Sequence, residues 1–311
     1  MAGTIHVTHR LSFPKNVSNI LECSLNSALV LLQSSSNVVY IINSKTMEEV
    51  AWIDSHKSQV TSACWNNEDV FVSYEDGVVI LFNTQTKTSI LHVICPHPLH
   101  FLCSNGKDIF GASYTSNNQS VVYTVKKSLL TQLFKISGLV TSMIYVNECI
   151  MVSSKGTLYL YNLSGKLLKK ESISTSPLSL SVQCCSFKRR YAHPYSEIKQ
   201  VNVVSALSTT GDVYFLQVVG KNKLQFMKKY TLFMNCYDSI AVDPYSSSWD
   251  NINFCIATKE FCFNCTTASF EKNELIPFTY PPVISLCHTT KGKLFLSSHR
   301  GEVAVYEWAD V

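Results

Sequence analysis

The 311-residue sequence predicts an all-β fold, a seven-bladed β-propeller of four-stranded antiparallel blades closed by the N-terminal strand. Three observations predict it. Residues 56–84 contain alternating apolar runs separated by short turns, similar units recur along the chain, and the segment Thr4–Phe13 is a strand with no local neighbour. A four-stranded unit cannot bury both of its faces alone, so we expect neighbouring units to cover them.

The unit at residues 56–84 is the most complete. His56 opens a loop, and strands are expected over Val60–Trp65, Val70–Tyr74 and Val78–Asn83. The tight turn before the third strand carries Asp76 and Gly77, and we expect Gly77 to take a positive φ there.

The other units repeat parts of this pattern. Glycine recurs between two apolar strands at Gly156, Gly211 and Gly301, again where a turn requires positive φ. The pair that ends the third strand, Phe82-Asn83, has counterparts in Ile42-Asn43, Tyr161-Asn162 and Tyr306-Glu307. In the third and sixth units, Asn117-Asn118 and Lys259-Glu260 replace the expected turn residues.

The repeats divide the chain into seven units within a single domain covering residues 1–311. The expected boundaries are 18–54, 60–94, 98–137, 139–174, 179–232, 237–279 and 282–311. The last unit is short by one strand, so Thr4–Phe13 is expected to complete it and remove the exposed sheet edges.

These motifs resemble the WD40 family. In that family a Gly-His pair precedes the first strand, an Asp-Gly turn precedes the third, and the third ends in Trp-Asp. Here Ser55-His56, Asp76-Gly77 and Phe82-Asn83 stand at those positions. The resemblance implies a hydrogen-bonded tetrad of His, Asp, a hydroxyl and Trp. Val72 stands where the hydroxyl belongs, with Ser73 next to it.

Targeting signals are not expected in this sequence. The first residues, MAGTIHVTHRLSF, lack the apolar core of a signal peptide, and no apolar run approaches the roughly 18 residues that span a bilayer. We therefore expect an intracellular protein, cytoplasmic or nuclear, without a transmembrane segment.

Cysteine and histidine patterns do not indicate a cofactor or a metal. Cys184-Cys185 are adjacent, and Cys262 and Cys265 fall on opposite faces of an expected strand, which does not suit a shared tetrahedral site. The 12 cysteines are expected to be small buried hydrophobes in a reducing compartment. His92, His97 and His100 are expected on a loop between two units.

No catalytic motif stands out. The sequence contains neither a G-x-S-x-G elbow nor a phosphate-binding G-x-x-x-x-G-K loop, and the acidic pairs fall in expected turns. We therefore expect a protein that is not an enzyme.

Charge is distributed unevenly along the chain. Residues 121–230 carry 15 Lys/Arg and 4 Asp/Glu, whereas residues 231–311 carry 5 and 9, and residues 1–90 carry 5 and 8. This predicts a basic sector over the third to fifth units. An alternative is that lysine pairs such as Lys169-Lys170 and Lys228-Lys229 protect edge strands from pairing.

The densest basic segment is Lys188-Arg189-Arg190-Tyr191, at the start of an expected loop insertion that extends to Lys199. Arginines beside a tyrosine suit acidic peptides, phosphates or a nucleic-acid backbone. These four residues are the candidate partner-binding residues, with a solvated loop as the alternative. His56, Asp76, Gly77, Phe82 and Asn83 are expected to be structural.

Two functions from different classes follow. The first is a non-catalytic scaffold or adaptor that binds one or more proteins of a multisubunit complex. The second is a phosphoinositide- or nucleic-acid-binding propeller that uses the basic sector. The turn Ser154-Lys155-Gly156-Thr157 resembles that of the PROPPIN family of lipid-binding propellers, but Arg189-Arg190 is followed by Tyr191 where that family requires glycine.

Overall fold

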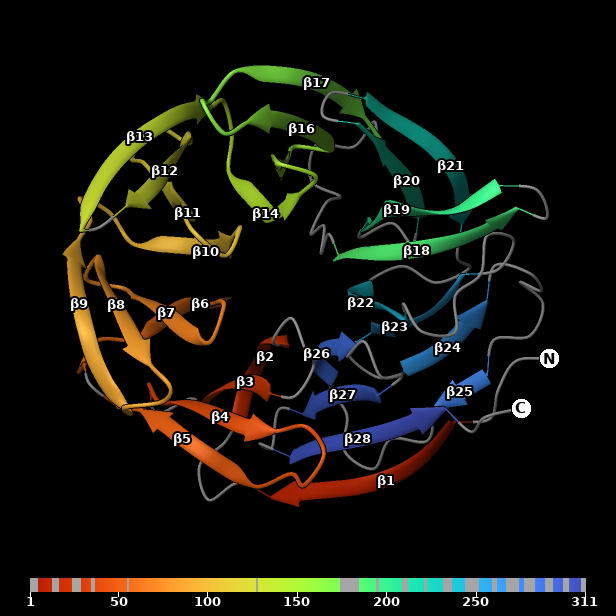
Figure 1. The fold of residues 1–311 in the computed structure, drawn as a ribbon, viewed down its shortest axis with the longest axis horizontal. Coiled ribbons are helices and arrows are strands. Elements are labelled where there is room, and N and C mark those ends of the chain that lie inside the picture. The colour runs from red at the N-terminus through yellow and green to blue at the C-terminus, as the bar shows by residue number, and fades with distance from the viewer. Residues whose placement is uncertain are drawn as a thin grey trace. The chain divides into compact units, whose positions relative to one another are not determined.

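All regular structure in the described part of the chain is β-strand. The structure is a computed structural model. It describes residues 5–12, 17–23, 29–34, 37–54, 56–126, 128–173, 185–193, 196–208, 212–220, 223–231, 237–243, 252–258, 262–266, 274–276, 283–288, 293–298 and 302–308. Within these ranges, 28 strands form seven four-stranded sheets (Figure 1).

The sheets follow one another along the chain. The first is β2 (Val17–Cys23), β3 (Leu29–Ser34), β4 (Val39–Asn43) and β5 (Glu49–Ile53), and the second is β6 (Val60–Asn66), β7 (Asp69–Tyr74), β8 (Val78–Asn83) and β9 (Thr88–Ile94). The third is β10 (Leu99–Ser104), β11 (Ile109–Tyr114), β12 (Ser120–Lys126) and β13 (Leu129–Ile136), and the fourth is β14 (Val140–Val146), β15 (Cys149–Ser154), β16 (Thr157–Asn162) and β17 (Leu167–Ser172).

The fifth sheet is β18 (Cys185–His193), β19 (Ser196–Leu207), β20 (Asp212–Val219) and β21 (Lys223–Thr231). The sixth is β22 (Tyr237–Asp243), β23 (Asn253–Thr258), β24 (Cys262–Thr266) and β25 (Glu274–Ile276). The seventh joins β26 (Val283–His288), β27 (Lys293–Ser298) and β28 (Glu302–Trp308) to β1 (Ile5–Ser12) from the other end of the chain.

The chain forms two compact units. One contains residues 21–182 and 220–223, and the other contains residues 1–20, 183–219 and 224–311. The first unit thus holds the second, third and fourth sheets and most of the first. That the whole chain forms a single domain stays a prediction.

The N-terminal strand completes the seventh sheet. β1 lies antiparallel to β28, with pairing that runs from Ile5 opposite Trp308 to Ser12 opposite Glu302 (Figure 1). Without β1, the paired edge of β28 would be exposed. The partner expected for Thr4–Phe13 from the sequence is therefore the one found.

The core of the first unit lies between its neighbouring sheets. Val70, Val72 and Ile80 of the second sheet pack in one cluster with Val39 and Ile41 of the first. Phe71 and Val79, on the opposite face of the second sheet, pack with residues of the third. Because both faces are covered, central strands such as β7 are buried at consecutive positions and not only at alternate ones.

Positive φ values occur at the expected turns that are described. Gly77 has a φ of 86° and Gly156 a φ of 74°. Asn118, which stands in the third unit's turn, has a φ of 53°, consistent with the tolerance of asparagine for the left-handed region. Gly211, Gly301 and Lys259-Glu260 lie outside the described residues.

Candidate interaction site

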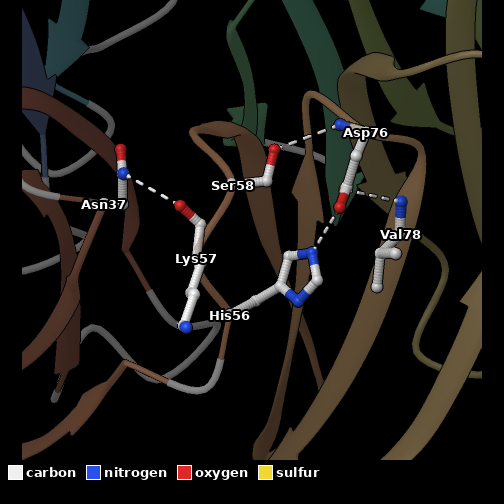
Figure 2. A network of polar contacts seen from close by, with 6 residues as sticks. All are labelled: Asn37, His56, Lys57, Ser58, Asp76 and Val78. Carbon is white, nitrogen blue, oxygen red and sulfur yellow. Dashed lines mark hydrogen bonds and ion pairs between the residues drawn. The ribbon is translucent and has the colours of Figure 1, made fainter.

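A polar network joins the loop before β6 to the turn between β7 and β8 (Figure 2). His56 Nε2 lies 2.5 Å from Asp76 Oδ2. The Asp76 backbone N–H donates to Ser58 Oγ at 3.2 Å, and the Val78 N–H donates to Asp76 Oδ1 at 3.2 Å. Asp76 therefore forms hydrogen bonds both within its own turn and to the preceding loop.

The electrostatics of this network favour the ionised carboxylate. Burial opposes ionisation of Asp76, but hydrogen bonds from His56 and from the Val78 N–H outweigh it and lower the pKa of the carboxyl group. The His56 ring also packs edge-on against Tyr74, with 4.7 Å between ring centroids. These contacts connect the loop to the turn, and the structural role of His56 and Asp76 stays a prediction.

Gly77 is required by space as well as by its backbone angle. A Cβ at this position would collide with the backbone carbonyl oxygen of Cys95. The two backbone segments approach this closely because the Cys95 N–H donates to the Gly77 carbonyl at 2.8 Å. This hydrogen bond connects the end of β9 to the turn at the start of β8.

A buried hydroxyl connects the second sheet to the third. Ser73 Oγ donates to the Leu99 carbonyl at 2.6 Å and lies 2.8 Å from Thr61 Oγ1, which contacts the same carbonyl at 2.7 Å. Ser73 is fully buried. Val72, which stands at the hydroxyl position of the WD40 pattern, packs in the apolar cluster. The hydroxyl of Ser73 bonds to the third sheet and not to His56 or Asp76, so Ser73 does not take that position.

The residues at the Trp-Asp position keep part of its role. Phe82 is buried in the core but has no ring N–H to donate, so it supplies only packing. Asn83 Nδ2 donates to Asp69 Oδ1 at 2.9 Å, and Asn83 Oδ1 accepts the Thr86 N–H at 2.8 Å. The carboxamide braces the turn after β8 as a local side-chain cap.

The hydroxyl pair and the asparagine side-chain cap recur in other sheets of the first unit. In the fourth sheet, Thr141 Oγ1 lies 2.8 Å from Ser153 Oγ, which repeats the pair Thr61–Ser73. Asn162 Oδ1 accepts the Ser164 N–H at 3.1 Å, and Asn43 Oδ1 accepts the Lys45 N–H at 2.8 Å. The sequence showed these asparagines as a repeat but did not show what they bind.

The candidate partner-binding residues lie on a strand and not in a loop. Lys188, Arg189, Arg190 and Tyr191 belong to β18, where Lys188 pairs with Asn202 and Tyr191 with Lys199. The prediction of a loop insertion from Lys188 was therefore wrong. The charged residues suggested an exposed loop. Two strands can nevertheless pair through their backbones where the side chains are not apolar.

This pairing extends beyond the four-stranded sheet. The pairing of β19 with β20 is described from Asn202 onward, whereas its pairing with β18 continues from Val201 to Ser196 (Figure 1). We call residues 188–193 and 196–199 the basic ribbon. The ribbon contains Lys188, Arg189, Arg190 and Lys199 against the single acid Glu197.

Other lysines of the basic sector lie on the fourth strands of their sheets. Lys169 and Lys170 are on β17, and Lys228 and Lys229 are on β21. Lys169 is 3.4 Å from Glu171, and Lys229 is 3.1 Å from Asp212. This placement favours the edge-protecting role for these lysines.

Cysteines and histidines occupy ordinary structural positions in the described part of the chain. Cys64, Cys95, Cys103, Cys149 and Cys255 are buried. His92 lies on β9, and His100 stacks on Tyr114 with 4.3 Å between ring centroids. Within the described ranges there is no group of three or more potential metal ligands. They also contain no helix that could span a membrane.

Comparison with solved structures defines the class of fold as a β-propeller. The propeller domain of Cps50 (Swd1) from Myceliophteria thermophila superimposes with a TM-score of 0.72, covering 98% of this chain and 100% of that chain at 10% sequence identity. No family sequence model and no curated protein sequence matches the chain. The predicted fold class is thus confirmed, and the resemblance to the WD40 family is supported at the level of fold.

Proposed function

We propose that this protein is a non-catalytic scaffold subunit whose basic ribbon binds an acidic surface of a partner protein. The observation that carries the proposal is that β18 and β19 stay paired beyond the described pairing of β19 with β20. This extension carries three basic residues, Arg189, Arg190 and Lys199, and one acidic residue, Glu197, and Lys188 lies at its start. A β-propeller supports many functions, so the fold alone does not choose among them.

The chemistry of the ribbon fits acidic groups. Arginine presents a planar fork of donors that matches carboxylates and can stack on aromatic rings, and Arg189 and Arg190 stand next to Tyr191. Positive charge on a projection also accelerates encounter with an acidic partner. A bound protein would leave the polar networks around His56 and Ser73 undisturbed, since those networks brace the sheets themselves.

The test is charge reversal of the ribbon followed by affinity purification. In Lys188→Glu/Arg189→Glu/Arg190→Glu, recovery of the partner should fall by about tenfold, because three surface ion pairs contribute roughly 0.2–1 kcal/mol each. Folding should be preserved, since surface charge changes typically alter stability by no more than about 0.5 kcal/mol.

A matched control reverses the same number of charges elsewhere. Lys166, Lys169 and Lys170 are exposed on the fourth sheet, and their reversal to glutamate should leave recovery of the partner unchanged. Equal loss in both triple variants would refute a specific ribbon site. Loss of RNA or of anionic liposomes in place of a protein would favour the lipid- or nucleic-acid-binding function, with steep salt dependence as its mark.

A further inference from the structure

β9 differs from the fourth strands of the other sheets in carrying no Asp, Glu, Lys or Arg. Its sequence is TSILHVI. Every other fourth strand of the seven described sheets contains at least one such residue: Glu49 in β5, Lys135 in β13, Lys169 in β17, Lys223 in β21, Glu274 in β25 and Arg10 in β1. Charged residues are the usual protection of a sheet edge against pairing with another chain.

β9 also exposes two large apolar side chains. Ile90 is 55% exposed and Ile94 is 79% exposed. The other large apolar residues exposed in the described ranges, Trp52, Leu129, Leu139, Leu167 and Phe226, lie singly on separate elements. His92 is exposed between the isoleucines, and no Asp, Glu, Lys or Arg separates them along the strand.

The backbone of β9 is available along one edge. β9 pairs with β8 from Val78 opposite Ile94 to Asn83 opposite Thr88, with a register shift at Ile90, and no described strand pairs with its other edge. Such an edge offers unpaired N–H and C=O groups to an added strand. Val93, 5% exposed, packs inward and fixes the strand on the core.

We propose that β9 binds an extended segment of a partner protein, which adds to the second sheet as a fifth strand. The segment should be uncharged and should carry β-branched apolar residues opposite Ile90 and Ile94, since side chains of directly opposed residues on neighbouring strands pack against each other. Opposite His92 it should carry a polar uncharged residue.

The size of the edge favours a peptide segment over a second copy of this chain. Seven residues span about 23 Å at 3.3 Å per residue. A stable contact between two globular proteins takes roughly 20–30 residues on each side. An added strand gains its affinity from main-chain hydrogen bonds along that length, so the edge suffices for an extended segment. The inference extends the scaffold proposal to a second surface and does not depend on the basic ribbon.

The test uses a capped, fluorescently labelled peptide of seven residues, with isoleucine at its first and fifth positions and threonine elsewhere. Fluorescence anisotropy should show saturable binding to the full-length protein. The same peptide with proline at its third position should not bind, because proline removes a backbone donor. Ile90→Lys/Ile94→Lys should weaken binding by at least about tenfold, because charge on an edge opposes strand addition.

The matched control is Leu129→Lys/Leu167→Lys, which adds the same charge at exposed apolar positions of β13 and β17. It should leave the affinity unchanged. If the lysine variant of β9 does not fold, Ile90→Thr/Ile94→Thr keeps the strand preference and should weaken binding several-fold.

Three results would overturn the proposal: no saturable binding to the wild type, equal weakening by the control, or equal binding of the proline peptide. A dimer that dissociates in Ile90→Lys/Ile94→Lys would also overturn it, because a second copy would then occupy the edge. Retention of the acidic partner by the β9 variant separates this site from the ribbon.

Discussion

Substitution of Gly77 by alanine tests how the turn before β8 is held. The change adds only a Cβ, which would collide with the Cys95 carbonyl at a position where φ is 86°. The left-handed conformation costs an alanine about 1–2 kcal/mol. Separation of the two backbones would also weaken the hydrogen bond from the Cys95 N–H to the Gly77 carbonyl, worth roughly 0.5–1.5 kcal/mol. The free energy of unfolding should therefore fall by about 2–3 kcal/mol.

Gly220 provides the matched control for this substitution. Its φ is 60°, and a Cβ there would meet no atom within 4 Å. Gly220→Ala should therefore lower the free energy of unfolding only through the left-handed backbone conformation, by about 1–2 kcal/mol. The assay is urea denaturation of both variants followed by circular dichroism. Equal destabilisation by the two substitutions, or a loss below about 1 kcal/mol for Gly77→Ala, would refute the role of close packing at this turn.

Three further predictions concern closure, pH and the buried hydroxyl. Deletion of residues 1–13 should expose the paired edge of β28 and cause aggregation in sedimentation experiments; a monomeric, cooperatively folded product would contradict this. Burial opposes ionisation of Asp212, but hydrogen bonds, including one from Lys229, lower its pKa below the ordinary 3.8. Its stabilisation is therefore present above pH 3.8 and lost as pH falls through the lower folded value, so the stability difference between wild type and Asp212→Asn should shrink below pH 3.8 in acid titrations. Ser73→Ala should lower the free energy of unfolding by about 1–3 kcal/mol, because a buried hydrogen bond to the Leu99 carbonyl is lost; an unchanged melting temperature would rule this out.

The strands of the second sheet could be predicted from the sequence because their ends carry local signals. Val60, Val70 and Val78 each begin an apolar run, and the Asp76-Gly77 turn separates the last two. The sheets that Val72 and Ser73 face could not be predicted, because β7 is buried on both faces. Without an alternation of buried and exposed residues, the sequence pattern does not indicate on which face of the sheet each residue lies.

The candidate binding segment shows a different limit. The composition of residues 188–199 indicated the chemistry of the segment but suggested a loop. Its structure is set by pairing between β18 and β19, which depends on backbone hydrogen bonds more than on an apolar pattern. In β9 the signal was present in the sequence, since seven residues without a charge are unusual for an edge, but its meaning depends on knowing that β9 is the last strand of its sheet.

In the proposed function, the basic ribbon contacts a partner protein. Hydrogen–deuterium exchange of the protein, alone and in complex with its purified partner, tests the claim without any substitution. Exchange should slow in residues 185–201 on binding, with little change in the turn at Gly77. Slower exchange confined to the loops around His56 and Gly77, with residues 185–201 unchanged, would contradict it.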